Sequence, residues 1–253
     1  MPETSMVKSI YGDNIFREIA CYPQPYSIEC TERLRDLREL GITEFYYYGE
    51  TLIGRFRVLG KGHAGIVVLC SNDNRIGVCK ILRVDSKKHS LENEARILRK
   101  LDHLGVSPIL YSFSNTVVFV EYIKGIKLSQ YLDCADRGSL IKMISKLVES
   151  TFLLDKIGVS HGELSRPAKH VLITRGDIPR IVDFEYASLS RKPRNQTQVF
   201  SALFFSRNTI SHKVASILGG KLFVCIQKEL FSIVQSKRGV NRDMFIKIIE
   251  KCS

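Results

Sequence analysis

Two clusters of polar residues flank a short apolar hairpin in the second half of the chain. The first cluster includes Glu163, Lys169 and His170 and ends at the apolar run 171–173, and the second begins at Asp183. A turn that contains Gly and Pro joins the two apolar runs, which predicts a two-stranded ribbon with both clusters at one edge. Carboxylates at such an edge can hold a hard divalent ion or accept a proton.

A glycine motif lies about a hundred residues earlier, with Gly60, Gly62 and Gly65 followed by Val67 in the pattern G-x-G-x-x-G-x-V. The same glycine spacing marks the dinucleotide-binding turn, but that turn must run into a helix. Here residues 66–69 are apolar and β-branched, so the motif predicts a hairpin and the dinucleotide-binding interpretation is excluded. Glycines let backbone N–H groups approach a phosphate closely; a glycine hairpin without a ligand is the alternative.

A lysine stands in the middle of the next apolar strand. Lys80 follows Gly65 by 15 residues. Burying its ammonium group is costly unless an acidic partner is near. Glu94 lies 14 residues further on, at the edge of the inward face of a predicted helix around residues 91–98, and Glu92 is the alternative partner if that helix is rotated.

The order, spacing and type of these elements over residues 53–187 resemble the protein-kinase superfamily. The resemblance implies that the glycine loop covers the phosphates of ATP and that Lys80, held by Glu94, contacts them. It also implies that Glu121 and Ile123 belong to the hinge that binds adenine, and that Asp183 binds Mg²⁺, with Mn²⁺ as an alternative ion.

The catalytic loop departs from the kinase pattern. Glu163 replaces Asp and lies seven residues before His170, where the family has five. His170 replaces the Asn that binds a second Mg²⁺; because imidazole favours softer transition ions, a hydrogen-bonding role is the alternative to ligation. Lys169 is expected either to touch the transferred phosphoryl group or to be solvated. D-F-E, beginning at Asp183, replaces D-F-G.

The expected fold class is α+β, a bilobal protein-kinase-like fold with an antiparallel N-lobe sheet plus helix C and a small, mainly helical C-lobe. We expect an N-terminal extension with an amphipathic helix over residues 1–50, the N-lobe over 51–123 and the C-lobe over 124–253. Arg33, Arg35 and Arg38 are expected to form a solvated face of the helix in the extension. No A-P-E motif closes a long activation segment. In this respect the chain is similar to RIO kinases and other atypical archaeal kinases.

The amino-acid composition adds expectations about location, cysteines and charge. No run of 18 apolar residues exists and the N-terminus lacks a secretion signal, so we expect a cytoplasmic protein without a membrane partner. Seven cysteines without a C-x-x-C pair predict free thiols instead of disulfides or a zinc site. Of the net charge of +12, residues 186–253 carry +9, part of it in the Gly239 basic cluster, which we define as Lys237, Arg238 and Arg242.

Together these features predict an ATP-dependent phosphotransferase, either an atypical Ser/Thr protein kinase or an ATPase, with ATP and a divalent metal between its lobes. The alternatives are a nucleotide-binding pseudokinase, an RNA-associated binding module and a small-molecule kinase. RNA or a ribosomal particle is the partner that the basic C-terminal region suggests, although a solvated surface explains the charge equally simply. The sequence leaves the substrate and the oligomeric state open.

Overall fold

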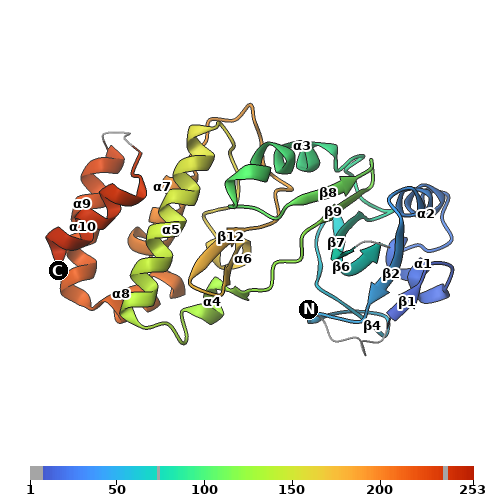
Figure 1. The fold of residues 1–253 in the computed structure, drawn as a ribbon, viewed down its shortest axis with the longest axis horizontal. Coiled ribbons are helices and arrows are strands. Elements are labelled where there is room, and N and C mark those ends of the chain that lie inside the picture. The colour runs from blue at the N-terminus through green and yellow to red at the C-terminus, as the bar shows by residue number, and fades with distance from the viewer. Residues whose placement is uncertain (1–7, 73–74, 236–238) are drawn as a thin grey trace. The chain divides into compact units, whose positions relative to one another are not determined.

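The computed structural model describes residues 8–72, 75–235 and 239–253, and the chain divides into two compact units (Figure 1). Unit 1 comprises Met1–His103 with Pro108–Tyr122, and unit 2 comprises Leu104–Ser107 with Ile123–Ser253. Lys237 and Arg238 of the Gly239 basic cluster lie outside the described residues. None of the described helices combines the length and the apolar character needed to cross a membrane.

Unit 1 is built on an antiparallel sheet with the strand order β1-β2-β6-β7-β9-β8 and with β5 beside β6. The strands are β1 (Lys8–Ile10), β2 (Ile42–Tyr46), β5 (Gly60–Lys61), β6 (Gly65–Asn72), β7 (Arg75–Leu82), β8 (Leu110–Phe113) and β9 (Val117–Val120). A separate hairpin pairs β3 (Thr51–Ile53) with β4 (Phe56–Val58). The strand continuing from the glycine motif and the strand that carries Lys80 are therefore confirmed as β6 and β7, and β-branched residues at their buried positions explain the assignment.

Three helices complete unit 1: α1 (Asn14–Ala20), α2 (Glu29–Glu39) and α3 (Glu92–Leu101), followed by the short η1 (Asp102–Leu104). Phe16 of α1 and Leu37 of α2 share one buried core with Phe45 and Phe119 of the sheet. The rings of Phe16 and Phe45 stack with their centroids 4.0 Å apart. The N-terminal helices thus belong to the core that carries the sheet.

The expected solvated face of α2 is wrong for Arg33, which is 5% exposed. Its Nε donates to Leu82 O at 3.1 Å, at the end of β7. On the same helix the buried Asp36 carboxylate accepts bonds from the backbone N–H and the hydroxyl of Thr116, at 3.1 and 2.6 Å. Polar residues of α2 face inward because backbone and hydroxyl groups of the sheet satisfy them.

Unit 2 is mainly helical. Its helices are α4 (Leu128–Tyr131), α5 (Arg137–Lys156), α6 (Pro167–His170), α7 (Asn195–Phe200), the π-helical η2 (Ser201–Phe205), α8 (Thr209–Leu218), α9 (Gly220–Gln235) and α10 (Arg242–Cys252). A small antiparallel sheet joins β10 (Ile126–Lys127), β11 (Val171–Thr174) and β12 (Ile178–Ile181). The predicted hairpin after His170 and the expected mainly helical C-terminal part are therefore confirmed.

The expectation of free thiols is wrong for six of the seven cysteines. Disulfides join Cys21 to Cys30, Cys70 to Cys79 and Cys225 to Cys252, and the exposed Cys134 is free. An odd count and the absence of C-x-x-C did not exclude disulfides, because the fold brings cysteines from separate turns and strands together. Cys70 and Cys79, for example, lie on the paired strands β6 and β7.

Candidate functional site

Unit 1 holds Lys80 and Glu94 as a buried ion pair. Lys80 Nζ lies 2.9 Å from Glu94 Oε2 and 3.2 Å from Oε1. The two side chains are 10% and 7% exposed, so the charges meet largely out of water, where an ammonium and a carboxylate need each other. Helix α3 delivers Glu94 on its inward face, and the exposed Glu92 points elsewhere, to Arg96.

The glycine motif forms the hairpin between β5 and β6. Gly60 pairs with Val67 in the antiparallel register, and Gly62 N donates to Gly65 O at 2.8 Å to close the tip. A Cβ at Gly65 would lie 3.4 Å from Cγ of Lys80 and 3.1 Å from Ile81 O. Glycine at this position therefore leaves room for the lysine stem on the neighbouring strand.

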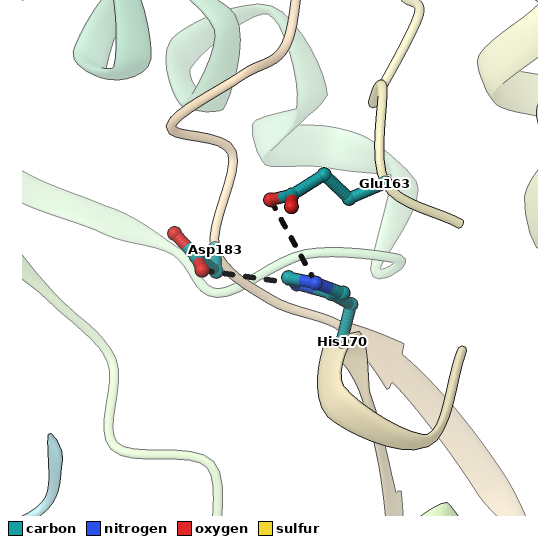
Figure 2. A group of neighbouring side chains, drawn as sticks. All are labelled: Glu163, His170 and Asp183. Carbon is teal, nitrogen blue, oxygen red and sulfur yellow. Dashed lines mark ion pairs between the residues drawn. The ribbon is translucent and has the colours of Figure 1, made fainter. Parts of the chain in front are cut away.

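Unit 2 gathers Glu163, His170 and Asp183 into one group (Figure 2). One ligand atom from each residue lies within 4.8 Å of the others. His170 Nε2 is 3.7 Å from Glu163 Oε2, and His170 Nδ1 is 3.7 Å from Asp183 Oδ2. The two carboxylates therefore lie near each other beside the imidazole, and the group has donors that could hold a divalent metal ion.

Backbone geometry positions the two carboxylates. Asp183 adopts a φ of 65°, a left-handed conformation that Asp tolerates better than most residues and that is common at functional sites. Gly162 has a φ of 93°, and a Cβ there would lie 2.8 Å from Tyr186 O. Glycine before Glu163 is therefore required by a close approach of the segment that follows Asp183.

His161 links the two loops that carry these carboxylates. Its Nε2 bonds Val182 O at 3.1 Å, and its Nδ1 accepts from Glu163 N at 3.4 Å. The side chain is fully buried. His161 therefore packs in the loop and bonds the backbone on both sides.

A second set of bonds holds His161 itself. Its backbone N donates to Asn195 Oδ1 at 2.8 Å, and Asn195 Nδ2 donates to Asp155 Oδ1 at 2.7 Å. Burial raises the pKa of Asp155 above its ordinary value, although hydrogen bonds from Asn195 and Gln196 oppose that shift. This network ties the loop of His161 and Glu163 to α5 and α7, and sequence reasoning missed it because its members lie 34 and 40 residues apart.

The remaining predicted site residues are placed separately. Lys169 is exposed on α6. Glu121 follows β9, where its N–H donates to Ile109 O at 2.9 Å and its carboxylate accepts from Ile109 N at 3.2 Å. Ile123 is 7% exposed and begins the segment that leads into unit 2. Within each unit, the structure brings together Lys80 with Glu94, and Glu163 with His170 and Asp183.

The contact of Glu163 with His170 is the site feature that sequence reasoning missed. Glu163 was expected as a catalytic carboxylate, with a structural salt bridge as the alternative, and His170 as a separate replacement for Asn. Seven residues separate them in the chain, and the turn into α6 brings them face to face. The unusual spacing was the available signal, since an insertion at a catalytic loop must be accommodated by a different arrangement.

Comparison with solved structures identifies the fold. The autoinhibited serine kinase domain of the giant muscle protein titin superposes with a TM-score of 0.54 at 13% sequence identity, over 77% of this chain and 80% of that one. The α+β, protein-kinase-like fold predicted from the motifs is therefore confirmed. At this identity the likeness concerns the fold alone.

Comparison of sequences adds one relative. A scan against models of known protein families finds no match. An uncharacterised protein of Methanocaldococcus jannaschii, MJ1211, is 31% identical over 85 residues, which are 34% of this chain and 72% of that protein. Because this identity extends over more than two thirds of that protein, this chain belongs to the same family as MJ1211.

Proposed function

We propose that this protein is an ATP-dependent phosphotransferase of atypical, RIO-like type that acts on Ser/Thr, or that hydrolyses ATP when no acceptor is bound. The observation that carries the proposal is the buried pair of Lys80 and Glu94. Lys80 lies on β7, which pairs with β6 of the glycine hairpin, and Glu94 lies on α3. An ion pair buried for stability alone is replaceable by apolar side chains. A lysine held by a glutamate beside flexible glycines is instead suited to a phosphate ligand.

In this proposal, backbone N–H groups around Gly60, Gly62 and Gly65 approach the phosphates, and Lys80 contacts the α- and β-phosphates. Glu121 and Ile123 contribute backbone groups to the adenine. Phosphoryl transfer asks a protein chiefly for positioning and for neutralisation of charge, and these residues supply both.

The carboxylates of unit 2 complete the proposal. Asp183 and His170 would hold a divalent ion, Mg²⁺ or Mn²⁺, which when bound neutralises charge on the phosphates. The donor set fits, because a carboxylate oxygen and a buried imidazole nitrogen lie 3.7 Å apart. Glu163 would accept the proton of the acceptor hydroxyl with the carboxylate oxygen that does not face His170, and Lys169 would approach the transferred group.

A pseudokinase is the second candidate, and the replacements at Glu163 and His170 favour it. The test is to measure nucleotide binding and the release or transfer of γ-phosphate on the same protein, with Lys80→Ala and Asp183→Ala as variants. Loss of binding or turnover in both variants supports the phosphotransferase. ATP binding without transfer to any acceptor or to water supports the pseudokinase, and unchanged affinity and turnover in both variants would exclude a kinase-type site.

The proposed partner and location follow from the charge of the chain and from its composition. RNA or a ribosomal particle is proposed as a partner of the positively charged segment 186–253. The cytoplasm is proposed as the location; three disulfides are unusual there, although intracellular proteins of hyperthermophilic archaea carry them.

A further inference from the structure

The ring of His170 has an unusual environment (Figure 2). His170 is buried, with a side chain 7% exposed. Among the described residues its Nδ1 has no hydrogen-bond partner. Asp183 Oδ2 lies 3.7 Å away on that side, which is beyond the range of a hydrogen bond. A buried ring nitrogen that lies near a carboxylate without bonding it can share a metal ion with that carboxylate.

The spacing suits a metal ion. Ions of the first transition row bind imidazole nitrogen and carboxylate oxygen at about 2.0–2.2 Å. Two such ligands then lie roughly 3–3.6 Å apart around an octahedral or tetrahedral ion. The 3.7 Å between Nδ1 and Oδ2 requires a movement of only a few tenths of an ångström.

Glu163 occupies the second position that such a site needs. A histidine that binds a metal through one nitrogen nearly always directs its other N–H to a carboxylate or a carbonyl. Here Glu163 Oε2 lies 3.7 Å from Nε2, and Glu163 and Asp183 offer oxygens within 4.8 Å of each other. His161 bonds the backbone N–H of Glu163 and so restrains that residue in turn.

We propose that His170 Nδ1 and an oxygen of Asp183 hold a divalent first-row transition ion in preference to Mg²⁺ and before nucleotide binds, with Glu163 orienting the imidazole. The physical reason is ligand type: carboxylate and amide oxygens suit Mg²⁺, whereas imidazole favours Mn²⁺, Co²⁺ or Zn²⁺ more strongly. The inference concerns the metal of the proposed phosphotransferase site and rests on that proposal for its role in catalysis.

The experiment uses Mn²⁺ and Co²⁺ with the full chain and no nucleotide. Exposed Cys134 is changed to Ser in every protein, because a free thiol also binds Co²⁺. Pulsed electron paramagnetic resonance of bound Mn²⁺ should show nitrogen coupling in the parent protein and none in His170→Asn. Titration with Co²⁺ should give one site, and excess Mg²⁺ should compete poorly in the parent protein but well in His170→Asn.

Matched variants separate the roles. His170→Asn and Asp183→Asn should each weaken Co²⁺ binding by more than about 100-fold, whereas Glu163→Ala, which removes an orienting partner, should weaken it by about 10–100-fold. His212→Asn, at an exposed histidine of α8, should leave it unchanged. Because every protein site binds transition ions more tightly than Mg²⁺ to some degree, the change caused by His170→Asn is the decisive quantity.

Two results would overturn the inference: bound Mn²⁺ without nitrogen coupling in the parent protein, or equal Co²⁺ affinity in the parent and His170→Asn proteins. Either result would indicate that His170 is a hydrogen-bonding residue beside the two carboxylates. Binding of labelled ATP is measured separately with Lys80→Ala. A protein that binds Co²⁺ through His170 but never binds ATP would keep the metal site and refute the phosphotransferase. A protein that binds ATP but holds no metal through His170 would keep the phosphotransferase and refute the metal site.

Discussion

The Lys80–Glu94 pair allows stability and nucleotide binding to be separated. Lys80→Met keeps most of the side-chain volume but leaves the carboxylate of Glu94 buried without the ammonium group. Since the two side chains are 10% and 7% exposed, breaking the pair should lower the free energy of unfolding by about 3–5 kcal/mol. In a chain of this size that corresponds to a fall in Tm on the order of 10 °C.

The double variant Lys80→Met/Glu94→Leu removes both charges and replaces them with apolar groups. Its unfolding free energy should return to within about 1 kcal/mol of the parent protein, because a buried ion pair is often replaceable by packed apolar side chains. ATP affinity should not recover. The loss of a charged hydrogen-bond donor to phosphate, worth roughly 1.5–3 kcal/mol, predicts binding weaker by about 10–100-fold in both variants.

Urea denaturation followed by circular dichroism gives the free energies, since the chain has no tryptophan for fluorescence. Binding of a fluorescent ATP analogue gives the affinities. The controls are Lys100→Met and Glu92→Leu, at exposed positions of α3, the helix that carries Glu94. They should change neither the free energy of unfolding nor the ATP affinity. A double variant that folds stably and still binds ATP as tightly as the parent protein would refute the assignment of Lys80 to the phosphates. Undiminished stability of Lys80→Met alone would refute the desolvated ion pair.

Four further outcomes are expected. Glu163→Gln should lower phosphate transfer by at least about tenfold and leave ATP binding intact, as measured by single-turnover transfer; equal rates would make Glu163 structural. Because burial raises the pKa of Asp155, the stability from its protonated form is present below the unfolded pKa and is lost as pH rises through the folded one. The unfolding free energy of the parent protein relative to Asp155→Asn should therefore fall as pH rises above the unfolded pKa of about 4, and a constant difference would contradict the shift. Thiol labelling of the denatured protein should find one cysteine, Cys134, before reduction and all seven after it, whereas seven before reduction would exclude the disulfides. Structured RNA, if it binds segment 186–253, should be released steeply as salt rises and should bind less tightly, whatever its sequence, after reversal of the Gly239 basic cluster to Glu; no binding at low salt would remove RNA as a partner.

The sequence by itself determined the glycine hairpin and the strands around it in unit 1. Alternating and β-branched runs specify strands, and glycine at Gly65 with a strand continuing beyond it specifies a hairpin, because these preferences act within a few residues. The partnership of Lys80 and Glu94 was also predictable. An ammonium group in an apolar strand cannot be left unpaired, and one nearby helix offered a carboxylate at the edge of its inward face.

Tertiary structure alone decided the arrangement around His170. The contacts with Glu163 and Asp183 depend on the left-handed backbone at Asp183, the close approach at Gly162 and the turn into α6, none of which has a local sequence signature. The inward-facing Arg33 and the three disulfides were likewise outside the reach of pattern reasoning. Whether a polar or thiol side chain finds a partner depends on chain segments far away in sequence, and only the folded molecule brings those segments together.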